Sequence, residues 1–452
     1  MSGETPSPSA APQRSLAQRL PLPEGTLPVG LGLLIAGICS FAFFRVGKFA
    51  LGSEEAFKPV TGLWFATFAL APGFFLPLEQ ELGRAISVRR VLGHGGRPVV
   101  RRVATLGALI ATIVTVALLA VGPWLRSQYF EGSWIMVVAL AISIVAYAPA
   151  HLSRGICSGS GRFRAYGIVL GADGVMRIVF CLLLAAFSVK AVGAYGLAVA
   201  CAPLVGVGIV AWQRELRTEP GPDASWGEVT PNLGWLLLGS VMAALLVNAG
   251  PLALGLLASS NQDAEITRFG YGVILARVPL FLFQAVQAAL LPRLARLATT
   301  GQMGEFRRGF RRLMTIVLVV GAMGTAGAYV LGPKAVKMLY DSKLSSRTLA
   351  VLALGSVCYM VALAAAQAVI ALHGHALVAL GWTIGVVAFV ITTAVLGHGD
   401  AWLFKRVELG VLVGSAAAMV TFLLALRSRL RSGAQVDSES LLEAVTDRPL
   451  EF

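Results

Sequence analysis

Charged and amide side chains inside long apolar segments are the residues of this sequence best placed to do chemistry. Insertion scales give a charged residue at the centre of a membrane-spanning helix a cost of roughly 2.5–3.5 kcal/mol, so function is sought first where such residues occur. The candidates in this chain are Arg45, Lys48, Asp173, Arg177, Asn248, Arg277 and Gln284.

The four cations among these candidates suggest a site for an anion. A guanidinium matches phosphate oxygens with its planar fork and stays charged at every physiological pH. We therefore expect Arg45, Lys48, Arg177 and Arg277 to face a central water-filled cavity and to hold an anionic substrate. The polar candidates for the same cavity are Asp173, Asn248 and Gln284.

Each candidate also has a structural interpretation. Arg45 and Lys48 share one face near the end of their segment, from which long side chains can reach the lipid headgroups. Asp173 precedes Arg177 by four residues, the spacing of a neutralising pair on one helix. Amides such as Asn248 commonly hydrogen-bond between membrane helices. The sequence leaves these alternatives open.

A second polar group follows the second apolar segment. Glu79, Glu81 and Arg84 lie close together at the end predicted to be cytoplasmic. They are compatible with a local ion-pair network or, alternatively, with a cytoplasmic gate that opens during a transport cycle.

Nothing in the sequence indicates a metal, a cofactor or an enzyme. His373 and His375 flank a glycine without a third ligand, and none of the five cysteines is spaced as a metal ligand. The phosphate loop GxxxxGK[ST] and the motifs HExxH and GxSxG are missing. No hydrophilic stretch is long enough for a catalytic domain. The pattern favours movement of a substrate over its conversion.

The elements that carry these residues are predicted to be membrane helices. The chain is 56% hydrophobic and only 13% charged, with a mean hydropathy of +0.76, which excludes an ordinary soluble protein. The net charge of +14 lies in short loops between apolar segments, which argues against nucleic acid as a partner. About twelve segments can span a bilayer, at 29–50, 58–78, 103–124, 134–153, 166–187, 192–212, 233–257, 269–291, 314–331, 349–372, 376–396 and 404–426.

The basic residues also indicate orientation and an internal duplication. Most Lys and Arg residues fall on the side of both termini, which predicts a multi-pass plasma-membrane protein with cytoplasmic ends. Two arginine-rich loops follow the second and eighth segments and indicate two six-helix halves. The predicted parts are a disordered tail at 1–24, a lobe at 25–213, a cytoplasmic linker at 214–232, a lobe at 233–426 and a cytoplasmic tail at 427–452 that meets membrane lipids.

Three stretches of the chain resemble polysaccharide flippases of the multidrug/oligosaccharidyl-lipid/polysaccharide exporter superfamily. They are VNAGPLALGLLASSNQDAEITRFGYGVILARVPLFLFQAVQAALLPRLARLATTGQ at 247–302, FFLPLEQELGRAISVRR at 74–90 and RGICSGSGRFRAYGIVLGADGVMRIV at 154–179. With the helix count, the resemblance covers most of the chain, although its motifs are soft patterns of Gly, Pro and Arg.

The resemblance implies two six-helix lobes around a central cationic cavity. It also implies an activity, the flipping of a polyprenyl-diphosphate-linked saccharide from the inner to the outer leaflet by alternating access, for cell-surface polysaccharide biosynthesis. Arg45 and Arg277 are the positions that could match diphosphate-binding arginines of related flippases. The implied partners are the lipid-linked saccharide and cell-envelope glycosyltransferases.

Two other functions remain as alternatives. A cation-coupled multidrug exporter of the same superfamily needs carboxylates at mid-membrane depth, and Asp173 is the candidate for that role. A membrane-embedded glycosyltransferase or polymerase needs catalytic residues on a large outer loop, and no loop here is large enough.

Overall fold

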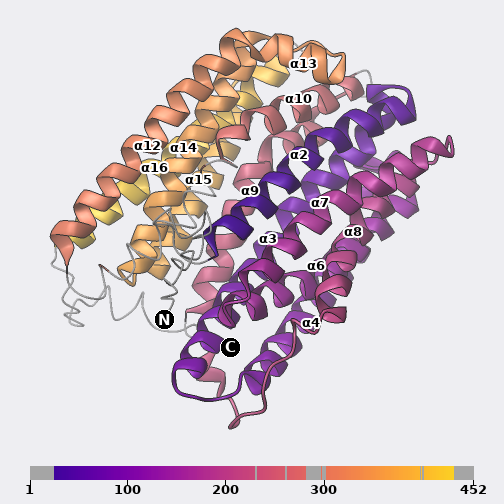
Figure 1. Cartoon of the computed structure of the whole chain (residues 1–452). Coiled ribbons are helices and arrows are strands. Elements are labelled where there is room, and N and C mark those ends of the chain that lie inside the picture. The colour runs from indigo at the N-terminus through magenta and orange to yellow at the C-terminus, as the bar shows by residue number, and fades with distance from the viewer. Residues whose placement is uncertain are drawn as a thin grey trace, which may run out of the picture.

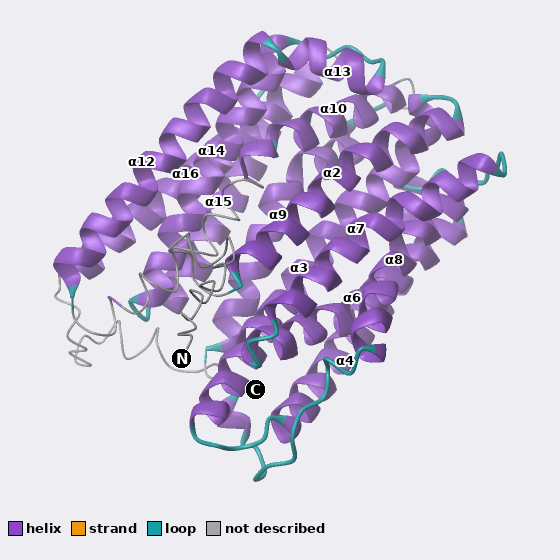
Figure 2. Cartoon of the chain, viewed as in Figure 1, coloured by secondary structure: helices purple, strands orange, loops and turns teal. Residues whose placement is uncertain are grey.

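A computed structural model describes residues 25–229, 232–259, 262–280, 302–397 and 402–431, together with 283, 297 and 399. In these ranges the chain is a bundle of helices joined by short loops (Figure 2). The helices are α2 (Thr26–Leu51), α3 (Glu54–Val91), α4 (Arg97–Ala120), α5 (Gly122–Gln128), α6 (Trp134–Gly159), α7 (Phe163–Ala186), α8 (Val192–Trp212), η1 (Trp226–Glu228), α9 (Leu233–Leu257), α10 (Asp263–Ala276), α12 (Met303–Val330), α13 (Gly332–Tyr340), α14 (Ser346–Ala371), α15 (His375–Val395) and α16 (Leu403–Arg431).

Eleven of the described helices are long and apolar enough to cross a membrane. The segment predicted at 269–291 begins within α10, and most of its second half lies outside the described residues. The tail predicted at 1–24 and the acidic part of the C-terminal tail also lie outside them. The all-helical membrane architecture is confirmed.

Helix α3 shows how the local sequence sets the ends of an element. The Ser53 side chain accepts the backbone N–H of Ala56, which caps the helix, and Glu54 and Glu55 place negative charge at its positive end. Its 38 residues make a rod of about 57 Å, longer than the bilayer core. The helix therefore carries Glu79, Glu81 and Arg84 beyond the segment predicted at 58–78.

The helices form two lobes, α2–α8 and α9–α16, built on the same packing scheme (Figure 1). In the first lobe α2 packs on α7, and α6 packs on both α4 and α8. In the second lobe α9 packs on α15, and α14 packs on both α12 and α16. The short helices α5 and α13 occupy equivalent places, and each begins with Gly-Pro. This confirms the predicted pair of six-helix lobes.

Glycine permits the closest helix approaches within each lobe. A side-chain methyl at Gly32 of α2 would lie 2.6 Å from the carbonyl oxygen of Gly167 in α7. Gly385 and Gly414 bring α15 and α16 together in the same way. Small residues at such crossings allow backbones to approach, which is how membrane helices associate without a strong hydrophobic drive.

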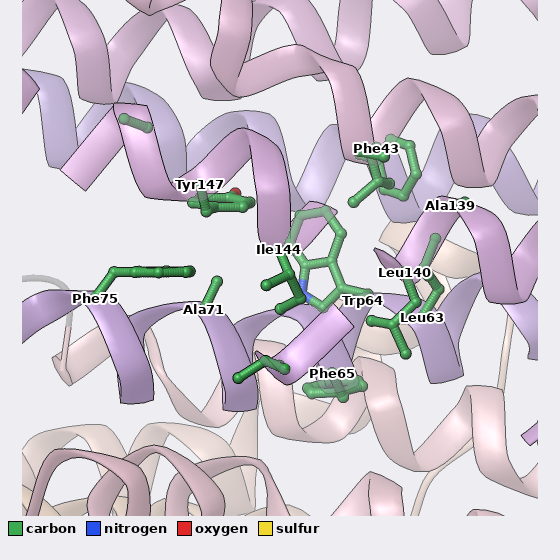
Figure 3. Packing of buried hydrophobic residues seen from close by; sticks show 14 of the residues in the cluster. Phe43, Leu63, Trp64, Phe65, Ala71, Phe75, Ala139, Leu140, Ile144 and Tyr147 are labelled. Carbon is green, nitrogen blue, oxygen red and sulfur yellow. The ribbon is translucent and has the colours of Figure 1, made fainter. Parts of the chain in front are cut away.

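Aromatic side chains fill the centre of the first lobe (Figure 3). The rings of Phe43 and Trp64 stack at 5.2 Å, with Phe44 edge-on to Trp64 at 5.1 Å. Phe44 also meets Tyr271 of the second lobe edge-on at 6.2 Å. The aromatic core therefore continues to the boundary between the lobes.

The two lobes are joined along α3, α9 and α10 and, through charged side chains, at one end of the bundle. We call the side of segments 92–96 and 213–229 the terminal side, and the side of segments 121–133 and 331–345, which contain α5 and α13, the distal side. Helix α3 runs along α9 and α10, and α2 reaches α13 at the distal side. Figure 1 shows α13, α10 and α2 together at that side, whereas the terminal ends of α12 and α3 lie apart.

Two predicted boundaries differ from the structure. The tail predicted to begin at 427 is helical to Arg431, because α16 continues past its apolar part. Helix α12 begins at Met303 and not at 314, so it carries Arg307, Arg308, Arg311 and Arg312 on its first turns. Both differences have the same reason. The charged ends of these helices project beyond the hydrocarbon core, and hydropathy detects only the part of a helix that lies in the lipid.

Candidate functional site

Arg45 and Lys48 lie at the distal end of α2, against α13 of the other lobe. Arg45 Nη1 donates to the carbonyl of Met338 at 2.9 Å and also to that of Leu339. Lys48 Nζ donates to the carbonyls of Tyr340 and Asp341, the latter at 3.2 Å. The last carbonyls of a helix lack helical partners and carry its negative dipole end, so they attract cations. The predicted placement in a central cavity is corrected: these side chains tie the lobes together.

Carboxylates extend this contact between α3 and α10. Glu54 lies 3.4 Å from Lys48 Nζ, and its Oε2 accepts from Arg268 Nε at 2.5 Å. Lys58 Nζ meets Asp263 Oδ1 at 2.6 Å. We call Arg45, Lys48, Glu54, Lys58, Asp263, Arg268 and the α13 carbonyls the distal gate. Sequence reasoning missed its acidic half, because partners more than 200 positions apart leave no local signal.

Helix α5 and the residues that follow it reinforce the distal gate with neutral hydrogen bonds. Gln128 Nε2 donates to the carbonyl of Gly255 at 3.1 Å, and the Tyr129 hydroxyl donates to that of Leu252 at 2.9 Å. Glu131 lies 3.7 Å from Lys58, and partial burial raises the pKa of its carboxyl. The hydrogen bonds of Gln128 and Tyr129 join one lobe to the other, whereas the contact between Glu131 and Lys58 lies within the first lobe.

Arg177 is enclosed within the first lobe. Its Nη2 donates to Asp173 Oδ2 and, at 3.1 Å, to the Tyr147 hydroxyl, which in turn donates to Asp173 at 3.0 Å. The guanidinium lies over Trp64 at 4.8 Å and is 2% exposed (Tyr147 and Trp64 are in Figure 3). The predicted cavity position of Arg177 is corrected to a buried pair with Asp173, the structural alternative for these residues.

Arg277 lies at the C-terminal end of α10, where the two lobes meet. Its Nη2 donates to the carbonyl of Val247 and, at 3.0 Å, to Asn248 Oδ1, and the guanidinium lies 5.5 Å from the Phe65 ring. Asn248 Nδ2 donates to the carbonyl of Phe68 in the other lobe at 3.0 Å. Within the described part of the chain, no carboxylate forms an ion pair with Arg277.

The space beside Arg277 is small in this state. The cavity there measures about 20 Å³ and is lined by Tyr359, Ser356 and Ser415 among others. A space of that size holds roughly one water molecule. Among the described residues, the space beside Arg277 is therefore far smaller than the predicted chamber. Gln284, predicted to share the chamber, lies outside the described residues.

Glu79 belongs to a buried cluster in the first lobe. Its carboxylate accepts from Arg154 Nε at 3.0 Å and from the Tyr166 hydroxyl at 2.7 Å, and it lies 2.8 Å from His151 Nδ1. Glu81 pairs instead with Arg84 at 2.7 Å. The predicted group of Glu79, Glu81 and Arg84 is thus divided into two sites.

The linker between the lobes is bound to the terminal end of α3. Arg89 Nε donates to Glu228 Oε2 at 2.8 Å, and its other nitrogens donate to the carbonyls of Gly95, Pro222 and Asp223. Arg84 donates to the carbonyl of Glu228 at 2.7 Å. The hydrogen bond from Arg89 lowers the pKa of the Glu228 carboxyl. The linker is therefore held by the first lobe.

Metal-ligand chemistry has no candidate in the described ranges. No group of three or more His, Cys, Asp or Glu side chains is placed to hold an ion there. The five cysteines, Cys39, Cys157, Cys181, Cys201 and Cys358, are all free thiols.

Comparison with known proteins places the fold. No family model matches the chain. Two uncharacterised proteins of Mycobacterium tuberculosis are each 25% identical to it, one over 371 residues (78% of this chain and 81% of that protein) and the other over 388 residues (81% and 84%).

Solved structures are similar over nearly the whole chain. A variant of the Vibrio cholerae MATE transporter VcmN has a TM-score of 0.67 at 16% identity, covering 90% of this chain and 96% of that one. A Pyrococcus furiosus MOP superfamily transporter, described as having a binding pocket of reversed polarity, has a TM-score of 0.68 at 14% identity, covering 91% and 96%. The chain has the fold of MATE transporters.

Proposed function

We propose that this chain is an alternating-access transporter of the multidrug/oligosaccharidyl-lipid/polysaccharide exporter superfamily that flips a polyprenyl-diphosphate-linked saccharide. The MATE fold supports the transport class. The substrate is proposed from the charges that the two lobes bring to their boundary.

The distal gate is the observation that carries the proposal. Alternating access requires two lobes that can separate at one side of the membrane while they close at the other. Here the distal contacts are ion pairs and hydrogen bonds between side chains and carbonyls, such as Lys58 with Asp263. No covalent bond joins the two lobes at the distal gate. The gate can therefore open when a conformation with separated distal ends is stabilised.

Arg277 supports an anionic substrate. Its guanidinium is satisfied here by neutral acceptors, Asn248 and the Val247 carbonyl, and not by a carboxylate of the described chain. A diphosphate carries opposite charge and can accept two parallel hydrogen bonds from one guanidinium, which neutral acceptors such as these do not offer. A substrate diphosphate can therefore displace these acceptors. Because Asn248 also donates to Phe68 across the boundary, that exchange would loosen the contact between the lobes.

A cation-coupled exporter is the second candidate, and Asp173 favours it. Asp173 Oδ1 is buried without a hydrogen bond from the described residues, next to the Arg177 guanidinium. A proton or a cation arriving at this oxygen would compete with Arg177 for the carboxylate. The exporter differs from the flippase in needing Asp173 for coupling and not Arg277 for binding.

The decisive experiment replaces Arg277 with alanine in the full-length protein. Flipping of a labelled polyprenyl-diphosphate sugar in liposomes should fall by about tenfold or more, because hydrogen bonds to charged groups contribute roughly 1.5–3 kcal/mol. Arg164→Ala, which removes an exposed arginine from the first turn of α7, is the matched control. Normal flipping by Arg277→Ala would contradict the flippase proposal. A loss of drug export in Asp173→Asn, with flipping absent in all variants, would support the exporter.

The location follows from the same proposal. The chain would lie in the plasma membrane with the terminal side in the cytoplasm, where cell-envelope glycosyltransferases would supply its substrate. Labelling of single introduced cysteines in intact cells tests this. A cysteine at Ser127, exposed on α5 at the distal side, should react with a membrane-impermeant maleimide, and one at Glu219 in the linker should not.

A further inference from the structure

A long apolar groove lies in the first lobe, away from the boundary between the lobes. Its volume is about 520 Å³, within the range of roughly 300–1,000 Å³ that is usual for ligand sites. It is lined by Phe75 and Leu78 of α3, by Val145, Ala148, Pro149, His151 and Leu152 of α6, and by Val103, Ala104, Gly107, Ala108, Ala111, Thr112, Thr115 and Val116 of α4.

The groove exists because α4 packs mainly on α6 and only lightly on α3. The α4 side chains along the groove are mostly small, with Gly107 and Ala108 at its middle, so they do not fill the space that α3 leaves. Its lining on α4 runs from position 103 to 116, a length of about 20 Å along the helix axis. The groove is therefore long and parallel to the membrane-spanning direction.

The neighbouring surface of α4 faces hydrocarbon. Ile113 and Val116 are 58% and 59% exposed, and α4 is one of the helices able to cross a membrane. Figure 1 shows α4 at the outer edge of its lobe. A groove that opens on a lipid-facing surface can be occupied only by lipid chains or by another membrane helix. A helix 20 Å long and about 10 Å wide occupies roughly 1,600 Å³, three times the volume of the groove, which favours a lipid chain.

A cation stands at the terminal end of the groove. Arg101 precedes Ala104, Ala108, Thr112 and Thr115 at intervals of three or four residues, which places it on the same face of α4. It is exposed, and none of the described residues bonds its guanidinium. Its position in the second turn of α4 corresponds to the headgroup level, where an arginine is suited to a phosphate.

We propose that the α3–α4–α6 groove with Arg101 at its mouth binds one phospholipid of anionic headgroup, with an acyl chain in the groove and the phosphate on Arg101. The site is separate from Arg277 and from the distal gate, so this inference does not depend on the proposed function. A bound lipid would occupy the space that α3 and α4 leave between them and so stabilise the first lobe.

Native mass spectrometry of the purified full-length protein tests the proposal with phosphatidylglycerol and phosphatidylcholine. Wild type should retain one lipid, with a preference for phosphatidylglycerol. Ala108→Trp fills the groove and should abolish retention, whereas Ala117→Trp, on the opposite face of α4, should not. Arg101→Gln should weaken phosphatidylglycerol binding about fivefold and leave phosphatidylcholine unchanged, and Arg164→Gln should change neither.

A phospholipid that carries a photoreactive diazirine in its acyl chain gives the position of binding. Cross-links should map to α4 and α6 in wild type and disappear in Thr112→Phe, a milder filling variant that guards against misfolding of Ala108→Trp. Equal retention by both groove-filling variants would overturn the proposal. So would cross-linking of the groove to a second protein chain, or retention of a polyprenyl phosphate but of no phospholipid.

Discussion

Single residues at the distal side show how ion pairs hold this conformation. Glu54 has a nearly buried carboxylate that faces Lys48 and Arg268, and its Oε1 has no hydrogen bond from the described residues. The Tyr271 and Tyr340 hydroxyls nearby are also buried without a partner there, and their rings stack at 4.2 Å. Unsatisfied buried groups of this kind cost roughly 1–3 kcal/mol each. The contacts of the distal gate are therefore formed but not optimally satisfied, which agrees with the proposal that they open.

Glu54→Gln should open the distal side. The amide cannot neutralise Lys48 and Arg268, so we expect the distal-open population to rise by about tenfold, which corresponds to roughly 1.4 kcal/mol. Spin labels at Arg126 and Lys334, in a background without native cysteines, would report the distance between the lobes. Glu55→Gln is the matched control, because Glu55 is adjacent but exposed. An unchanged distance distribution in Glu54→Gln would remove Glu54 from the distal gate.

The Asp173–Arg177 pair makes a different prediction, about stability. Arg177→Met leaves the Asp173 carboxylate buried without its cation and should lower the unfolding free energy by roughly 3 kcal/mol or more. The double variant Asp173→Leu with Arg177→Met removes both charges and should recover most of that loss. Thermal unfolding in detergent measures both. Equal destabilisation of the single and double variants would contradict the paired arrangement.

At the scale of elements, the close crossings and the bound linker decide what can move. Helices α2 and α7 touch at Gly32 and Gly167, and the linker is held to α3 through Arg89. These contacts fix α2 against α7 and attach the linker to the first lobe.

Gly167→Val tests the α2–α7 crossing. Its added side chain would clash with the Pro28 carbonyl, which lies 2.4 Å from the first added carbon. We expect a loss of roughly 1–3 kcal/mol in stability, measured by thermal unfolding. Gly208→Val, in α8 where nothing lies within 4 Å, carries the same change in helix propensity and should have little effect beyond it.

The Glu228–Arg89 contact predicts a pH dependence of the linker. Because the folded pKa of Glu228 lies below its usual value of about 4.3, the contact contributes stability above that value and loses it as pH falls through the folded pKa. Limited proteolysis should cut the wild-type linker faster at about pH 3 than at pH 7, after correction for protease activity on an unfolded substrate. Glu228→Gln should be cut fast at both pH values, and Glu219→Gln should behave as wild type. Slow cleavage of Glu228→Gln at pH 7 would disagree with the role of the contact.

At the scale of the whole molecule, the two lobes meet along α3, α9 and α10 and are joined by charges at the distal side. A cycle that opens the distal side must break these contacts and form others at the terminal side. Arg277 is linked through Asn248 to the backbone of α3, so under the proposed cycle it would sense the separation of the lobes.

A reversible lock across the distal gate tests the whole cycle. Lys58→Cys with Asp263→Cys, joined by a short bifunctional methanethiosulfonate, should stop transport, and reduction should restore it. Either single variant with the same reagent should keep its activity. Transport that continues in the locked double variant would argue that opening of the distal side is not part of the cycle.

The sequence by itself determined the class of the protein, the approximate helices and the two lobes. Hydropathy is a local property, and about twenty apolar residues in a row can bury their backbone polar groups in lipid only as a helix. The pairing of Asp173 with Arg177 was also visible as an alternative, because partners four residues apart share a helix face. Boundaries failed where charged turns extend a helix beyond the bilayer, as in α12 and α16.

Only the tertiary structure decided which charges meet. Arg45 and Lys48 hydrogen-bond to carbonyls at the C-terminal end of α13, nearly 300 positions later in the sequence. Glu54 pairs with Arg268, more than 200 positions later. Glu79 pairs with Arg154 and His151 of α6 and not with Arg84. The reason is that α6 packs against the face of α3 that carries Glu79. The energy of an ion pair depends on distance and burial, which are set by the packing of helices remote in sequence. No local pattern encodes them.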